Sequence, residues 1–285
     1  MRRIASLALA SLLALPAYSA SVWKVSDGEN TMYLGGTLHI LSPQDYPLPE
    51  EYKTAYSQSD ALVFETDIAA LSTPEFAQKS LQMLTYGEGG SLKDDVSDDT
   101  LKQLETHLAA RGVPVDRFMN LRPALVGISL SMIEFQRLGL TSQGVDKYYY
   151  TLGMGDGKAM HYLESPEQQL TFISKMGEGN EDAYVSYAIE DVKRMPEMLG
   201  DLKDDWREGD MASFYALSME EFADEYPDIY DLLLTSRNNN WMPVLTDLMT
   251  TPETEFVLVG AMHIPGDTGL ITQLKAKGYS VEQMK

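Results

Sequence analysis

An apolar run that ends in glycine, two residues and histidine occurs twice in this chain, once near each end. The first copy, TMYLGGTLHI, begins at Thr31 and carries its histidine at position 39, and the second, EFVLVGAMHI, begins at Glu255 and carries His263. Both runs have the length and composition of buried strands, and a proline and an aspartate follow each of them. We expect the two strand ends to meet in space and the two histidines to share one function.

The order of the predicted elements indicates an α/β fold with a mostly parallel central sheet. Strand, GxxH motif, helix and strand follow one another at both ends of the chain, and a large helical insertion separates these two units. We expect strands at residues 22–25, 31–34, 61–68, 159–163, 255–259 and 279–283. We expect the main helices at residues 50–59, 166–176, 181–199, 210–223, 228–234 and 267–277.

The first 19 residues have the pattern of a signal peptide. Arg2 and Arg3 precede an apolar stretch, residues 4–15, which is too short to span a bilayer. Small residues follow and predict cleavage after Ser19 or Ala20. We therefore expect an exported, periplasmic protein without a membrane-spanning segment in its mature part.

The length of the chain, 285 residues, fits one large domain or two modest ones, and we expect a single domain over residues 20–285 after the signal peptide. Within it, residues 20–70, 158–165 and 251–285 are expected to form the sheet core. Residues 71–157 and 166–250 are expected to be mainly helical, because their apolar residues recur at intervals of three and four.

The composition argues against several kinds of partner and site. The 43 acidic and 22 basic residues give a formal net charge of −21, which repels phosphate backbones and anionic membranes. The sequence contains no cysteine, so disulfides, thiolate metal ligands and cysteine nucleophiles are absent. We expect no nucleic-acid partner, and a peptide or a small molecule as the substrate.

Four polar residues fall at or just past the ends of predicted strands: His39, Glu65, Glu164 and His263. Ligands of parallel sheets gather at the carboxyl ends of the strands. Two imidazoles and a carboxylate form a three-ligand set for a divalent ion such as Mn, Co or Zn and leave positions open for water and substrate. Such an ion lowers the pKa of its water and supplies a nucleophile near neutral pH. Asp67 shares a strand face with Glu65, so a positive group or a shared proton is expected beside this carboxylate pair.

Each of these residues also has a structural interpretation. The two histidines can be strand-end residues without a ligand. Glu164 can cap the helix that follows it, because carboxylates favour helix N-termini. Glu65 can form a salt bridge with Arg237, and this arginine can either fix the helical part by a buried ion pair or stabilise an oxyanion during a reaction.

Several motifs, taken together, resemble the TraB/GumN/Tiki family. They are GGTLHIL and LVFETDI near the start, GxD at residues 144–146, LESPEQQL from Leu163, RNNNW from Arg237, and the terminal block VLVGAMHIPGDTGLITQLKAKGYSVEQM. They cover nearly all of the expected mature chain, in order. The exported, single-domain form resembles the GumN-like bacterial branch.

The resemblance implies an α/β fold related to erythromycin-esterase-like and ChaN-like proteins. In the Tiki branch it implies a metal-dependent protease that uses both GxxH histidines and a glutamate. Carried over to this chain, the protease residues are His39, His263 and Glu65, with Asp67 as a further acidic candidate ligand. The remaining matches are Glu164, Glu167 and Gln169 in the Glu-rich motif and Arg237 as the family arginine.

Three functions follow from these residues and from the resemblance. The first is an exported metal-dependent hydrolase of the peptidase type, with Glu65 or a neighbouring carboxylate as the general base. The second is a metal-independent, esterase-like hydrolase in which a histidine and Glu65 activate water directly. The third is a protein without enzymatic activity that binds haem or a metal ion, as the ChaN-like relatives suggest.

Overall fold

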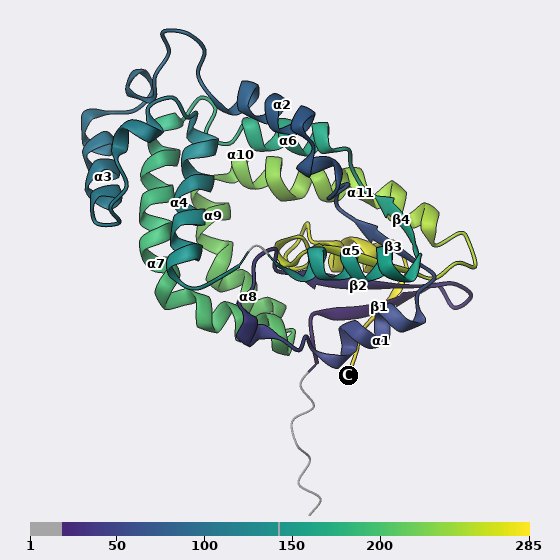
Figure 1. Ribbon diagram of the computed structural model, residues 1–285. Helices are drawn as coiled ribbons and strands as arrows, with labels where there is room; N and C mark the ends of the chain where they lie inside the picture. Colours follow the sequence, from purple (N-terminus) through teal and green to yellow (C-terminus); the bar gives the residue numbers. More distant parts are fainter. Residues whose placement is uncertain (1–18, 142) are drawn as a thin grey trace, which may run out of the picture.

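The computed structural model describes residues 19–141 and 143–285, in which a six-stranded sheet lies beside a group of long helices (Figure 1). The strands are β1 (Val22–Ser26), β2 (Thr31–Thr37), β3 (Ala61–Phe64), β4 (Ala159–Tyr162), β5 (Glu255–Gly260) and β6 (Ser280–Gln283). The helices of the first half are α1 (Glu50–Gln58), α2 (Pro74–Leu84), α3 (Asp98–Ala109), α4 (Pro123–Arg137) and α5 (Val145–Asp156). Those of the second half are α6 (Pro166–Ser174), α7 (Glu181–Glu208), α8 (Met211–Ser218), α9 (Glu220–Glu225), α10 (Pro227–Tyr230), α11 (Ser236–Leu248) and α12 (Leu270–Ala276). The predicted α/β class with a helical insertion is confirmed.

The order of the strands in the sheet is β4-β3-β5-β2-β1-β6. Strand β5 lies between β2 and β3 and is parallel to both, and β4 is parallel to β3. Only β1 runs against its two neighbours. The carboxyl ends of β2, β5, β3 and β4 therefore lie at the same edge of the sheet, and the strands that precede the two GxxH motifs are direct neighbours.

Two large apolar cores and a smaller third cluster around Leu84 and Leu170 stabilise the described part of the molecule. The first surrounds the sheet, where every residue of β5 is buried and the rings of Tyr52 from α1 and Tyr149 from α5 pack with Phe256. The second lies among the helices and includes Leu104 from α3 and Val126 from α4. The inner parallel strands β2, β3 and β5 are buried on both faces, which explains why their sequences are continuous apolar runs, whereas β4 at the edge of the sheet is mostly exposed.

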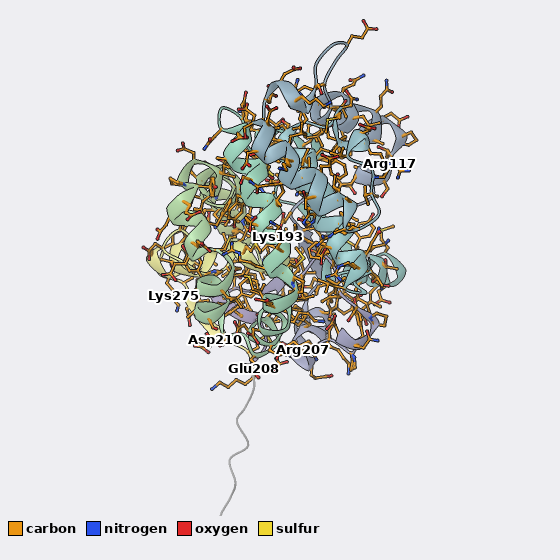
Figure 2. The ribbon with its side chains drawn as sticks, turned by 90° about the vertical axis from the view of Figure 1, so that its left-hand side faces the viewer. Arg117, Lys193, Arg207, Glu208, Asp210 and Lys275 are labelled. Atoms are coloured by element: carbon orange, nitrogen blue, oxygen red, sulfur yellow. The ribbon has the colours of Figure 1, made fainter. Side chains whose placement is uncertain are left out.

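Helix α7 connects the two cores and is longer than the sequence predicts. The predicted end at residue 199 is wrong, because the helix continues through Pro196 to Glu208 and stops at Gly209, whose φ is 66°. Trp206 near its end is fully buried in the sheet core and donates a hydrogen bond from Nε1 to the carbonyl of Gly36 at 2.7 Å. Figure 2 shows the outer side of α7, with Lys193 along it and Arg207 at its end.

Several other boundaries differ from the predictions, and three of these differences change an element. Strand β3 ends at Phe64 rather than at residue 68, because Asp67 accepts hydrogen bonds from the amides of Ala69 and Ala70 and so closes a turn. The segment 210–223 forms two helices, α8 and α9, instead of one. Residues 228–234 belong to a longer helical segment, in which one π-helical turn (Asp231–Thr235) joins α10 to α11.

The predicted signal peptide falls on residues 1–18, outside the described part of the chain, and on Ser19. Among the residues that the structure describes, no helix is both long and apolar enough to cross a membrane.

Glu255, the first residue of β5, makes the stability of the fold depend on pH. Its side chain is 1% exposed, and within the described chain its Oε2 has no hydrogen-bond partner. Burial, with smaller contributions from Glu253 and Asp60, raises the pKa of this carboxyl from 4.5 to about 7. Between these two values the folded state binds more protons than the unfolded state, so stability falls as pH rises toward 7.

Glu255→Gln is therefore expected to raise the free energy of unfolding at pH 8 by up to about 3 kcal/mol, and by little at pH 4.5. Urea unfolding at both pH values measures the difference, with the exposed Glu29→Gln as the control. An equal change at the two pH values would contradict the role assigned to Glu255.

Candidate functional site

The candidate site lies at the edge of the sheet where four parallel strands end. Glu65 directly follows β3, His39 follows β2 by two residues, and Glu164 follows β4 by two residues. His263 ends a short 3-10 turn (Ala261–His263) that directly follows β5. The backbone brings Glu164 beside Glu65, because the amide of Glu164 donates to the Glu65 carbonyl at 2.9 Å.

The absence of a side chain at Gly260 leaves a small space between the two histidines and Glu65. A Cβ atom at this position would lie 3.2 Å from Glu65 Oε1, 3.3 Å from His39 Nε2 and 3.7 Å from His263 Cδ2. The amide of Gly260 donates to Glu65 Oε1 at 2.7 Å, and this oxygen is 4.0 Å from His263 Nε2. The second GxxH motif therefore has little room for a side chain at its glycine, and the three predicted ligands border the same small space.

His39 is held by Asp146, the acidic residue of the GxD motif. Its Nδ1 lies 2.8 Å from Asp146 Oδ2, and the hydroxyl of Thr37 donates to the other oxygen at 2.7 Å. Gly144 allows this contact, since a Cβ there would lie 2.2 Å from the His39 carbonyl carbon. The negative charge of Asp146 raises the pKa of His39 to about 9, although burial acts in the opposite direction.

His263 is held in one tautomer by Asn238. The amide nitrogen of Asn238 donates to the carbonyls of His263 and Thr268, at 3.2 and 3.0 Å, so its Oδ1 faces His263 Nδ1 at 2.6 Å. We assign the ring proton to Nδ1 from this network, which leaves the lone pair on Nε2. Burial, together with the charge of Arg237, lowers the pKa of His263 to about 3, so the ring is neutral at physiological pH.

Arg237, from the first turn of α11, is the positive group that the sequence predicts beside the carboxylates. Its Nη2 donates to Glu65 Oε2 at 2.6 Å and to Glu164 Oε1 at 2.7 Å, and its Nη1 lies 3.1 Å from His263 Nε2. Trp241, one turn later, donates to Glu164 Oε2 at 3.1 Å. Arg237 is 8% exposed, so this is a buried ion pair, as one of the two interpretations of Arg237 predicts.

The two carboxyl groups bound to Arg237 differ in their proton affinity. Burial alone raises the pKa of Glu65, but Arg237 and the two histidines outweigh it and lower the value to about 2. Burial also raises the pKa of Glu164, and there the arginine offsets it only in part, so the value stays above the usual range. Glu164 is therefore the carboxyl of this pair that accepts a proton more readily.

Three of the residues named in the sequence analysis make contacts other than those expected. The prediction that Glu164 caps α6 is wrong: Ser165 is the N-cap, its hydroxyl accepts from the Gln168 amide, and the Glu164 side chain faces Arg237 instead. Asp67 lies in the turn after β3, with its carboxylate on backbone amides, and does not share a face with Glu65. Glu167 pairs with Lys79 at 3.4 Å, whereas Gln169 reaches Glu65 Oε2 at 3.4 Å.

A cavity of about 460 Å³ opens beside this network. His39, Glu65, Asp146, Gln169 and Arg237 give it one polar side. Its other walls are apolar and come from Ile68, Leu71, Phe172, Ile173 and Leu233. A volume of this size is within the range of about 300–1,000 Å³ that is usual for small-molecule sites.

Asp146 and Asn238 were not among the predicted site residues. Asp146 belongs to GxD and Asn238 to RNNNW, so both lie in motifs that the sequence presents. The sequence does not say that Asp146 meets a histidine 107 positions earlier, nor which of three successive asparagines faces inward.

Histidine and carboxylate side chains are residue types that bind divalent metal ions. Both histidines direct Nδ1 at a fixed oxygen, which is the support that metal-binding histidines usually have. Nε2 of His263 carries a lone pair, whereas His39, whose pKa is raised to about 9, must lose a proton from Nε2 before it can bind a metal ion. Within residues 19–141 and 143–285, however, no group of three or more His, Asp or Glu side chains is arranged to hold an ion. In addition, Arg237 Nη1 bonds to the lone pair of His263. Binding of an ion therefore requires this contact to open.

The comparisons with known proteins agree with the motifs. The model of the TraB/PrgY/gumN family matches residues 21–283. The chain is 23% identical over 249 residues to the uncharacterized protein YbaP of Escherichia coli (strain K12). The aligned residues cover 87% of this chain and 89% of the relative. The YbaP protein of Shigella flexneri gives the same identity and coverage. No solved structure matches the chain significantly. Because the family model spans nearly the whole described chain, this protein belongs to the TraB/PrgY/gumN family.

Proposed function

We propose that this protein is an exported, periplasmic metal-dependent hydrolase in which His39, Glu65 and His263 hold one divalent ion, Mn, Co or Zn. One observation carries the proposal: both histidines have Nδ1 fixed by a side-chain oxygen, and both rings border the space at Gly260 together with Glu65. Peptide bonds are the proposed substrate class, on the resemblance to the Tiki branch. A bound ion of this kind supplies a Lewis acid and a water of lowered pKa.

The side chains around this position have separable tasks. Asp146 and Asn238 orient the two imidazoles. Glu164, whose pKa burial raises, is available to take up a proton during the reaction, while Glu65 stays ionised beside Arg237. Arg237 Nη1 is the donor best able to turn to a developing oxyanion, because its Nη2 remains bound to both carboxylates.

A second candidate is a hydrolase that uses no metal, and one contact favours it. In the structure the lone pair of His263 accepts from Arg237, so Glu65 and His39 would have to activate water without an ion. The predicted binding of haem stays a prediction, because no contact of the site favours it over the two hydrolases.

Gly260→Ala tests the metal-dependent function. The added methyl group would occupy the space between Glu65 and His39, so we expect the protein to lose its bound ion and its metal-dependent peptide cleavage while it stays folded. Gly36→Ala, in the other GxxH motif, is the matched control, since its Cβ would come no closer than 3.4 Å to any atom.

The measurements are elemental analysis of protein purified without chelator and a peptide-cleavage screen with added Mn, Co or Zn. About one ion per chain and cleavage that a chelator abolishes are expected for the unaltered protein and for Gly36→Ala. Cleavage that persists in metal-free protein would favour the second candidate. If the protein retained no metal and none of the three ions changed cleavage, the proposal would be wrong.

A further inference from the structure

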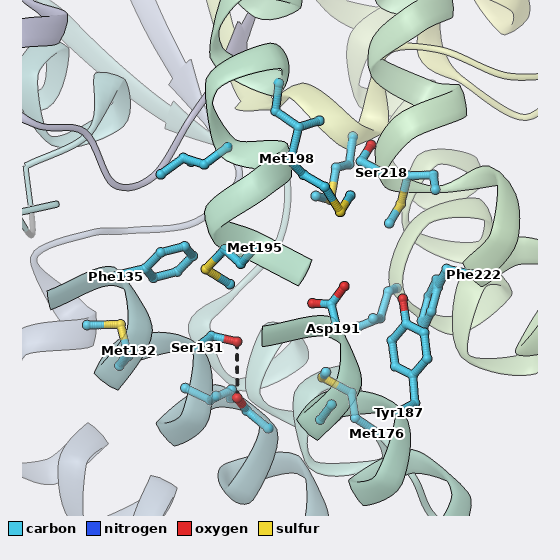
Figure 3. Close-up of a pocket in the computed structure, with 18 of the residues that line it drawn as sticks. Ser131, Met132, Phe135, Met176, Tyr187, Asp191, Met195, Met198, Ser218 and Phe222 are labelled. Carbon is cyan, nitrogen blue, oxygen red and sulfur yellow. Dashed lines mark hydrogen bonds between the residues drawn. The ribbon is translucent and has the colours of Figure 1, made fainter. Parts of the chain in front are cut away.

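A second cavity, of about 470 Å³, lies in the helical part between α4, α7 and the α8–α9 segment (Figure 3). Its walls are almost entirely apolar, and six of the sixteen methionines of the chain line it: Met132, Met176, Met195, Met198, Met219 and Met262. Methionine side chains are flexible and polarizable, so they adapt to an apolar ligand of irregular shape. The lining favours a hydrocarbon chain rather than a rigid polar molecule.

Asp191 is the charged side chain of this lining. Figure 3 shows its carboxylate turned away from α7 into the pocket, between Met195 and Tyr187. Among the described residues it accepts no hydrogen bond, and its nearest cation, Arg194 Nη2, is 3.9 Å away. Arg194 is bound more closely by Glu221, at 2.5 Å. One arginine between two carboxylates leaves a net negative charge beside an apolar cavity.

On the outer face of α7 a charged side chain has a closer partner of opposite charge. There Lys193, labelled in Figure 2, pairs with Glu190 at 2.5 Å in the solvent. The Asp191 side chain is 40% exposed, and its one cation among the described residues, Arg194 at 3.9 Å, is shared with Glu221. Partial burial raises the pKa of Asp191, and a second positive group would stabilise its ionised form. The cavity therefore combines space for an apolar chain with a carboxylate that Arg194 neutralises only in part.

We propose that this cavity binds an amphiphilic cation, a molecule with an alkyl chain that carries a protonated amine, with the amine at Asp191 and the chain among the methionines. The proposal does not rest on the hydrolase function. Leu233 lines both this cavity and the one at the candidate site, so the bound chain lies next to that site without occupying it.

Isothermal titration calorimetry with decylamine, below the concentration at which it forms micelles, tests the proposal at pH 7.5 and physiological salt. We expect one decylamine per chain, and binding about tenfold weaker or worse for decanoate, which has a similar chain and the opposite charge. Butylamine, with the same amine and a short chain, is expected to give no measurable binding. Since these probes have no hydrolysable bond, the result is independent of any enzymatic activity.

Two matched variants separate the cavity from the general negative charge of the protein. Asp191→Asn is expected to weaken decylamine binding about tenfold and to remove its advantage over decanoate. Glu197→Gln, at an exposed position on the same helix, changes the net charge equally and is expected to leave binding unchanged. Equal binding of decylamine and decanoate by the unaltered protein, absence of binding, or equal effects of the two variants would overturn the proposal.

Discussion

Arg237→Ala is expected to lower the free energy of unfolding by about 3–5 kcal/mol, the usual cost of removing one partner from a buried ion pair. The substitution leaves Glu65 and Glu164 buried without their shared cation and removes a hydrogen bond to His263. Urea unfolding at pH 7.5, followed by circular dichroism, measures the loss.

Three controls make this result specific to the buried network. Arg194→Ala removes an arginine that is about 40% exposed and is expected to cost no more than about 1 kcal/mol. Adding Glu164→Gln to Arg237→Ala should restore part of the stability, because one uncompensated carboxylate is then neutral. Lower pH should also restore part of it, since unpaired buried carboxyls bind protons more tightly when folded than when unfolded. If Arg237→Ala were as stable as Arg194→Ala, the buried pair would not be a main support of this edge of the sheet.

His39→Ala and His263→Ala are each expected to weaken binding of Mn, Co or Zn more than 100-fold, because each removes one of three proposed ligands. Removal of a supporting group beside a ligand usually costs about 10–100-fold, so Asp146→Ala should lie between these variants and the unaltered protein. Competition titrations with a metal indicator measure the three affinities.

His161→Ala is the matched control, since His161 lies on β4, is exposed and is not among the residues that line the site cavity. Circular dichroism establishes that each variant is folded. If His39→Ala and His161→Ala bound metal equally well, the shared site of the two GxxH motifs would have to be abandoned, even if the chain bound metal elsewhere.

The sheet of this protein can be predicted well from the sequence, because its inner strands are continuous apolar runs with clear ends. Runs such as FVLVG and ALVF are apolar at every position, as strands buried on both faces must be, and glycine or aspartate marks their ends. The repeat of GxxH correctly predicts that the strands before the motifs are neighbours in the sheet. Periodicity fails where a distant contact decides, as in α7, whose last turns are fixed by Trp206 in the sheet core.

The candidate site could be predicted only in part, for the same reason. The sequence shows which residues follow a predicted strand, and this position identifies His39, Glu65 and His263 as candidate site residues. The partner that orients a ring is not visible, because Asp146 and Asn238 reach the histidines through the packing of α5 and α11. For Glu164 the local sequence favours a helix cap over a site residue, and only the position of Arg237 shows that the cap is wrong.

The central position of β5 has a consequence for how the protein is made. The neighbours of this strand, β2 and β3, leave the ribosome about 200 residues before it, and they cannot complete their pairing until it arrives. Contacts of such sequence separation form late and slowly, because a long loop must be closed first. A nascent or truncated chain that lacks the last 31 residues, from Glu255 to Lys285, lacks β5, β6 and His263, so β1, β2 and β3 each have an unpaired edge. The candidate site therefore cannot form before β5 and the turn that carries His263 have been made.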